Sequence, residues 1–173
     1  MEYQDNQKKE EEMLQIRLKG IVQKWSKDGW INNVLKTEPI PTKRGVLDLC
    51  GCALGIRPWG SQECEQEMEQ LDKQIKLYYS PDESKEGTIR EDSFYIEDDY
   101  DGENIRFIQE IIVDADFIMY ISAEPALLEK LHTAFMHPVY IPCLGDHDCL
   151  PSCAISKGDV YVEIHKNLIE IVE

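Results

Sequence analysis

The stretch from residue 41 to residue 56 is the part of this sequence that most constrains the fold. Pro41 ends an extended segment, and Thr42 follows it as a candidate helix N-cap. Gly55, at the far end, can close the helix in a left-handed conformation. Apolar residues at helical spacing form one stripe between these ends: Val46, Leu47, Cys50 and Leu54. The sequence therefore predicts a core helix here.

The first turn of this predicted helix carries two cations, Lys43 and Arg44. Unpaired backbone N–H groups and the positive end of the helix dipole lie at the same place, and these features together favour phosphate binding. The alternative is a buried helix whose first turn happens to be basic. The local sequence leaves both interpretations open.

The charge of the chain is unevenly distributed. The 173 residues have a net charge of −16, and segments 1–12, 61–72 and 82–116 hold 23 of the 34 acidic residues but only 5 of the 18 basic ones. Residues 13–60 carry eight basic residues against three acidic ones. Nucleic-acid binding usually requires a clustered basic face, whereas acidic segments repel phosphate and can attract a basic partner.

The length suits one domain with a buried core. We expect a charged N-terminal extension at 1–12 and a single domain at 13–173, in which 82–103 form an acidic, thumb-like insertion, either a protrusion or a mobile loop. No apolar run reaches membrane-spanning length, and residues 1–12 are too polar for a signal peptide. The six cysteines lack the spacing of a secreted disulfide framework. We therefore expect a cytoplasmic protein with reduced thiols and no membrane contact.

Apolar periodicity predicts an α+β fold. Alternation predicts strands at 13–21, 74–79, 105–113, 116–122, 159–165 and 168–172, and helical spacing predicts helices after Ser61 and over 124–135. The strands at 105–113 and 116–122 could form a hairpin. Trp25 and Trp30 are assigned to a loop, as lids over the core or as stacking surfaces, and 136–158 to another loop. The element order is that of a ferredoxin-like or RRM-like β-α-β-β-α-β sandwich, a fold that does not define a function.

The residues with catalytic or metal-binding chemistry are few. Walker A, dinucleotide-binding and GxSxG motifs are absent from the sequence. A zinc site could draw on the soft ligands near the C-terminus: His137, Cys143, His147, Cys149 and Cys153. Their spacing is not a CxxC pair, however, and buried cysteines explain them as well. Nothing marks an activated thiol beside either histidine, so we expect no enzyme activity, no metal and no cofactor.

Four segments resemble the CasD family (Cas family five), the subunit of type I-E CRISPR Cascade that grips the 5′ handle of the guide RNA. Residues 18–26 resemble its opening strand and Gln-x-Trp-Gly exit, and residues 41–56 its Pro-Thr-Lys-Ser-Gly helix. Residues 113–117 resemble its Asp-Ala-x-Phe strand, and 138–149 its Pro-x-Tyr-x-Pro-x-Leu-Gly-x-x-x-Cys loop. The resemblance implies a set of residues that contact the RNA handle or dock on Cascade: Arg17, Lys19, Trp25, Pro41, Thr42, Lys43, Arg44 and Gly45.

The sequence departs from this family in the segment that forms the family's thumb. The family usually shows an Asp-Tyr-His-Thr-type stretch and basic residues there, whereas this chain has 90–96 and then an acidic run. The carboxylates of that run are candidate partner contacts: Glu97, Asp98, Asp99, Asp101 and Glu103. The chain also ends sooner after His165 than family members usually do, so it resembles a divergent, acidic and truncated CasD.

Three functions follow from the resemblance. A CasD-like decoy from a phage or mobile element would interfere with Cascade assembly or guide loading, as an anti-CRISPR that acts by subunit mimicry, and the acidic thumb favours this function. A genuine, divergent CasD would bind the 5′ handle of the crRNA. A handle-processing ribonuclease is the third, but no His, Lys and Tyr constellation supports it. The implied partners are the backbone and large subunits of Cascade, with crRNA as a partner of the genuine subunit.

Overall fold

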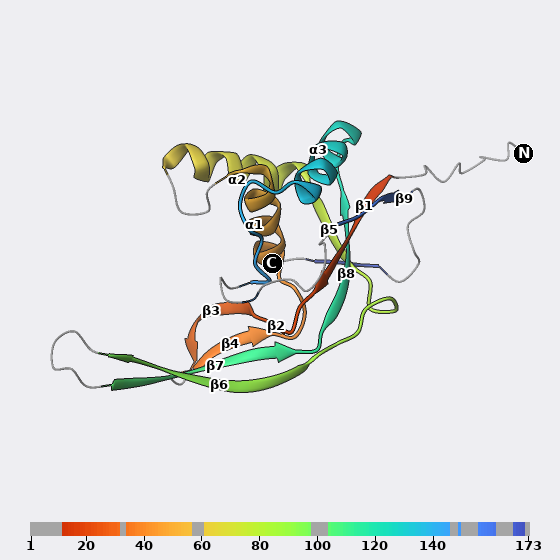
Figure 1. The fold of residues 1–173 in the computed structure, drawn as a ribbon. Helices are drawn as coiled ribbons and strands as arrows, with labels where there is room; N and C mark the ends of the chain where they lie inside the picture. The colour runs from red at the N-terminus through yellow and green to blue at the C-terminus, as the bar shows by residue number, and fades with distance from the viewer. Residues whose placement is uncertain are drawn as a thin grey trace, which may run out of the picture.

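The computed structural model describes residues 12–31, 34–56, 61–97, 104–145, 149, 156–161 and 168–171. Its first sheet is antiparallel and has the strand order β10-β5-β8-β1-β9. The strands are β1 (Met13–Lys19), β5 (Lys76–Tyr79), β8 (Asp116–Ser122), β9 (Ser156–Tyr161) and β10 (Ile169–Glu170). The helices α1 (Lys43–Leu54), α2 (Gln62–Gln74) and α3 (Pro125–Met136) lie together on one side of this sheet (Figure 1).

The order of the strands in this sheet confirms the predicted fold class. Taken along the chain, the elements β1, α1, β5, β8, α3 and β9 follow the β-α-β-β-α-β pattern. In the sheet, β9 lies next to β1, and β8 lies between β1 and β5. The fold is therefore α+β and ferredoxin-like, with α2 and β10 as additional elements.

β1 lies between β8 and β9, and its alternation divides its side chains between the two faces of the sheet. Leu14, Ile16 and Leu18 are fully buried in the main core, which also holds the buried faces of the three helices. Met13 packs instead with Ile118 in a smaller cluster formed by the alternate residues of the sheet. The period of two places alternate side chains on opposite faces. Residues such as Arg17 and Lys19, which alternate with the buried leucines, therefore stand on the opposite face, which no helix of the described residues covers and which we call the helix-free face.

Local capping fixes both ends of α1 as predicted. The Thr42 hydroxyl accepts a hydrogen bond from the Gly45 N–H at 3.1 Å. Gly55 adopts the left-handed conformation, with φ of 87°, and the next N–H, that of Ile56, bonds to the Gly51 carbonyl at 2.9 Å. Ser61 occupies the N-cap position of α2 as expected, although its side chain makes no capping bond.

Two insertions in the ferredoxin-like core form a second sheet. It has the order β2-β7-β4-β3, and β6 pairs along β7. Its strands are β2 (Val22–Gln23), β3 (Trp25–Ile31), β4 (Val34–Glu38), β6 (Thr88–Glu97) and β7 (Asn104–Val113). One insertion, between β1 and α1, supplies β2 to β4, and another, between β5 and β8, supplies β6 and β7. The β6–β7 pair projects from the body as a long ribbon (Figure 1).

Four sequence-based assignments are corrected here. Residues 88–97 form a strand rather than a loop, since β6 pairs with β7 over ten residues, and 98–103 lie outside the described residues. The strands β7 and β8 lie in different sheets and form no hairpin, because the chain turns at Asp114, with φ of 60°, from one sheet into the other. Trp25 and Trp30 belong to β3. The strand expected at 159–165 begins earlier, at Ser156, and is described as far as Tyr161, while 162–165 lie outside the described residues.

Other expectations fall wholly or partly outside the described residues. Of the N-terminal extension, the structure describes only Glu12. The three helices of the described ranges have 12 or 13 residues each, and none has the length and apolar composition needed to cross a bilayer.

Candidate functional site

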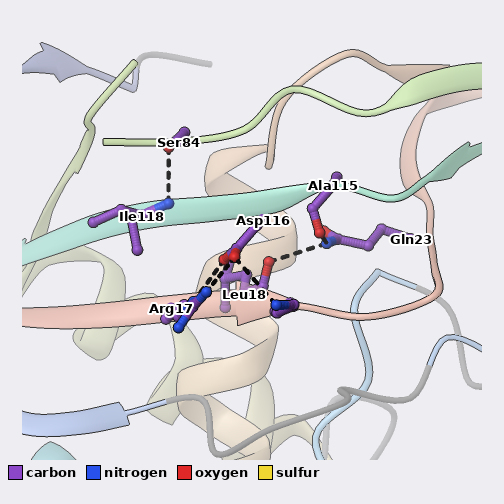
Figure 2. Close-up of polar contacts among 8 residues, drawn as sticks. Arg17, Leu18, Gln23, Ser84, Ala115, Asp116 and Ile118 are labelled. Atoms are coloured by element: carbon purple, nitrogen blue, oxygen red, sulfur yellow. Dashed lines mark hydrogen bonds and ion pairs between the residues drawn. The ribbon is translucent and has the colours of Figure 1, made fainter. Parts of the chain in front are cut away.

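Trp25 stands at the centre of the segments that resemble CasD. Its side chain is fully buried, and its indole N–H donates to the Gln23 side-chain oxygen at 3.1 Å. The Gln23 amide in turn donates to the carbonyls of Leu18 at 3.0 Å and Ala115 at 3.1 Å (Figure 2). The hydrogen bonds of Gln23 thus connect Trp25 to the end of β1 and to the residue before β8. A fully buried indole is not available to stack on a base.

The first turn of α1 packs directly on this tryptophan. A Cβ atom on Gly45 would lie 2.6 Å from Cε3 of Trp25, which is too close for any side chain. Pro41 is buried beside this turn, and Thr42 caps it. Among the residues expected to contact RNA or Cascade, Trp25, Thr42 and Gly45 therefore have clear structural roles. They hold the N-terminus of α1 in place, with its two cations at the surface.

The loop after α3 also packs against the backbone at Lys24 and Trp25. The Lys24 N–H donates to the Leu144 carbonyl at 3.0 Å, and the Leu144 N–H donates to the Cys149 carbonyl at 2.7 Å. Gly145 has φ of 93°, and a Cβ atom there would lie 1.6 Å from the Lys24 carbonyl oxygen. Leu144 and Cys149 are buried. Parts of all four CasD-like segments thus meet around Trp25, a convergence that the sequence alone does not reveal.

Arg17 and Lys19 form one basic cluster on the helix-free face. The Arg17 guanidinium donates two hydrogen bonds to the Asp116 carboxylate (Figure 2), one of them 2.7 Å long. Lys19 Nζ lies 3.7 Å from the same carboxylate. The bonds from Arg17 hold the pKa of Asp116 below its usual value, against the opposing effect of partial burial. The cluster therefore presents two cations and one ionised carboxylate.

Lys43 and Arg44 form a second basic cluster, at the N-terminus of α1. Lys43 Nζ lies 2.8 Å from Asp72 of α2, and Arg44 Nε lies 3.1 Å from Asp48, one turn along α1. Burial raises the pKa of Asp48, and the charge of Arg44 counteracts that rise. Each cation of the predicted phosphate site thus faces a carboxylate of the same chain.

A cavity of about 330 Å³ lies between α1 and α2 at this second cluster. Its lining combines the two cations with three carboxylates and two apolar side chains: Lys43, Arg44, Leu47, Glu65, Met68, Glu69 and Asp72. The acidic face of α2 therefore offsets the dipole and the cations of α1. A phosphate group that binds here must compete with these carboxylates.

The structure does not join the two basic clusters into one site. Arg17 and Lys19 stand on the helix-free face of the first sheet, whereas Lys43 and Arg44 stand on α1, which covers the opposite face. Sequence reasoning did not identify Asp72 and Asp116 as their partners. No local spacing signals a pair such as Lys43 with Asp72, because the two residues meet only when α2 packs on α1.

The acidic run is only partly described. Glu97 ends β6, and the other four candidates, Asp98, Asp99, Asp101 and Glu103, lie outside the described residues. Within β6, Glu91 and Asp92 are exposed. The segment 88–113 contains two arginines and eight carboxylates, a net charge of −6.

The described residues contain no group of three side chains placed to hold a metal ion. Cys149 is buried, while His147 and Cys153 of the candidate zinc set lie outside the described residues. Burial raises the pKa of the Cys50 thiol to about 12, so this cysteine is not an activated nucleophile.

The fold, a ferredoxin-like core that carries a second, mixed sheet and a projecting hairpin, is similar to those of a Cas protein and of a chain from a CRISPR RNA-guided surveillance complex. Solved structures match it, and one, a crystal structure of a Cas protein, is 27% identical over 88% of this chain and 66% of its own, with a TM-score of 0.62. A chain of a CRISPR RNA-guided surveillance complex is 17% identical and has a TM-score of 0.64, a likeness of fold alone. The match covers 89% of this chain and 64% of the chain from the surveillance complex. No protein-family model and no curated protein matches the sequence.

Proposed function

We propose that the protein is a CasD-like subunit of a type I-E-like Cascade complex and binds the 5′ handle of the guide RNA. One observation carries this proposal: the CasD-like segments converge on Trp25 and hold the first turn of α1 at the surface. Lys43 and Arg44 stand on that turn, with 24% and 72% of their side chains exposed. A helix N-terminus with two cations is suited to the phosphates of RNA.

The carboxylates beside these cations do not prevent RNA binding. The Arg44 side of the Arg44–Asp48 pair is exposed, and such pairs contribute only about 0–1 kcal/mol, whereas water and salt screen the Lys43–Asp72 pair less, because its side chains are 24% and 35% exposed. RNA presents many phosphates at once and gains from counterion release, so it can compete for Lys43 and Arg44. The proposed role is binding and assembly, and it requires no catalytic step.

Co-expression with a type I-E Cascade that lacks its own CasD tests this proposal. We expect a complete, guide-loaded complex that binds target DNA. The double variant Lys43→Ala/Arg44→Ala should lose guide loading while it still folds, because neither side chain belongs to the hydrophobic core. Lys73→Ala is the matched control, since Lys73 is a 75% exposed cation of α2 outside the cavity. If the complex fails to assemble, or lacks intact guide RNA, when the chain is co-expressed, the proposal is wrong.

The acidic hairpin favours a second candidate function, that of a CasD-like decoy. A segment of net charge −6 beside the guide would repel its phosphates while the rest of the fold still docks on a partner subunit. Expression of the chain beside an intact Cascade separates the two functions. A decoy lowers interference against a matched plasmid and yields complexes without intact guide, whereas a genuine subunit leaves interference unchanged.

A further inference from the structure

The strand β6 presents a long sheet edge that is unpaired within the described residues. β6 pairs with β7 over ten consecutive residues without a register shift, and no described strand lies on its other side. At about 3.4 Å per residue, ten residues give an edge roughly 30 Å long. From Thr88 to Ser93 every side chain is exposed, as is that of Tyr95.

The other edge strands in the described residues are short or irregular. The register between β3 and β4 shifts between Ser26 and Trp30, and that between β1 and β9 shifts between Leu14 and Ile16. The strands β2 and β10 have two residues each. Natural proteins use bulges, prolines and short strands to prevent edge pairing. β6 has none of these three features, contains no glycine, and includes β-branched and aromatic residues that suit a strand. Charged side chains, which also discourage the pairing of like edges, are present at Arg90, Glu91 and Asp92.

The charge of the hairpin selects what can pair with this edge. Glu91 and Asp92 lie exposed on β6 beside Arg90, and the ten residues of β6 hold three carboxylates and one cation, a net charge of −2. A second copy of the chain would bring the same negative charge to the edge, and a nucleic acid would bring phosphates, so both are repelled. A positively charged peptide segment gains from the same charges, and an extended one can also use the unpaired backbone groups.

We propose that the outer edge of β6 binds an extended, lysine- or arginine-rich segment of a partner protein as an additional strand of the second sheet. This inference goes beyond the proposed function and does not depend on it, since it concerns a different surface from the N-terminus of α1. Backbone hydrogen bonds provide the pairing, and the carboxylates of β6 provide the preference for basic partners.

Amide hydrogen exchange followed by NMR tests the proposal on the purified full chain. The probe is a capped peptide of alternating lysine and valine, which is basic and favours strands. Because successive N–H groups of a strand point to opposite sides, pairing should slow exchange at about every second amide of β6. Binding through side-chain charge alone would not produce this alternation. Absence of the alternating pattern in β6 overturns the proposal.

Two comparisons make the test specific. The same peptide with a central proline, which lacks an N–H donor, should bind about tenfold more weakly, and an equal dissociation constant overturns the proposal. Glu91→Lys should weaken binding about five- to tenfold, whereas Glu67→Lys, the same charge change on the exposed face of α2, should leave it unchanged. Equal effects of the two variants, or self-association of the chain without peptide in sedimentation, likewise overturn it.

The experiment needs no Cascade and no guide. A negative result therefore removes the β6 edge as a binding surface and leaves the proposed function intact. Failure of the chain to replace CasD would remove the proposed function and leave the edge proposal intact.

Discussion

Gly45 of α1 and Trp25 of β3 approach so closely that a Cβ atom on Gly45 would lie 2.6 Å from Cε3 and 2.8 Å from Cζ3 of the indole. The contact joins the first helix to the second sheet. Trp25 is fully buried and hydrogen-bonded to Gln23, so its ring cannot move aside without cost. Packing therefore explains why a glycine follows Lys43 and Arg44.

Gly45→Ala should lower the free energy of unfolding by about 1–2 kcal/mol. Overpacking against Trp25 destabilises the folded state by more than the higher helix propensity of alanine stabilises it. Gly51→Ala is the matched control within α1, because its Cβ would meet the flexible Sδ of Met68 at 2.6 Å instead of a rigid ring. Urea unfolding measures both variants. If Gly45→Ala instead stabilises the protein, the Trp25 ring can shift away from the new Cβ atom at little energetic cost.

Asp116 should make the stability of the protein depend on pH in the acid range. Its pKa is lowered from 3.8, chiefly by the hydrogen bonds from Arg17. A lowered pKa in the folded state means that the ion pair stabilises the protein fully above the unfolded value, and that this stability is lost as pH falls through the folded pKa. Asp116→Asn should therefore cost about 1–2 kcal/mol near pH 7 and almost nothing at strongly acid pH.

Urea unfolding of Asp116→Asn and of the natural chain across this pH range checks that expectation. Asp114→Asn is the control, since Asp114 is exposed and asparagine accepts its left-handed backbone, with φ of 60°. A stability difference for Asp116→Asn that persists unchanged below the usual aspartate pKa would contradict an ionised pair.

Asp72→Asn should strengthen RNA binding. The change removes the carboxylate that lies 2.8 Å from Lys43 Nζ and makes the cavity lining less negative. One additional phosphate contact should steepen the salt dependence of log K by about 0.7 for single-stranded RNA. Titration of a handle RNA at several salt concentrations measures both quantities. Glu67→Gln, on the exposed face of α2, controls for net charge, and an equal gain there would show that the site at α1 has no special role.

Cys50 should resist alkylation in the folded protein. Its thiol is fully buried and has a pKa of about 12, so only about one molecule in ten thousand carries the thiolate near pH 8. Cys64 of α2 is partly exposed and provides the internal comparison. Mass spectrometry after brief iodoacetamide treatment should find Cys64 modified and Cys50 modified only in urea. Equal rates at both cysteines in native buffer would mean that α1 opens readily.

The sequence by itself determined the ferredoxin-like core and the ends of α1. The strands of the core alternate and its helices have apolar stripes, and both patterns depend on residues a few positions apart. Thr42 and Gly55 cap α1 through contacts within one turn of the chain. Features that depend on such short separations can be recognised before folding brings distant residues together.

Only the tertiary structure decided the second sheet and the surroundings of the basic residues. The polar composition of 88–97 indicates a loop, and the strand forms there because β7, which contains four isoleucines, supplies a partner for its entire length. The chain turn at Asp114 sends β7 and β8 to separate sheets, and folding brings Asp116 to Arg17 and Asp72 to Lys43. Strand pairing and ion pairing join residues that are distant along the chain, and local periodicity carries no information about which distant residues will meet.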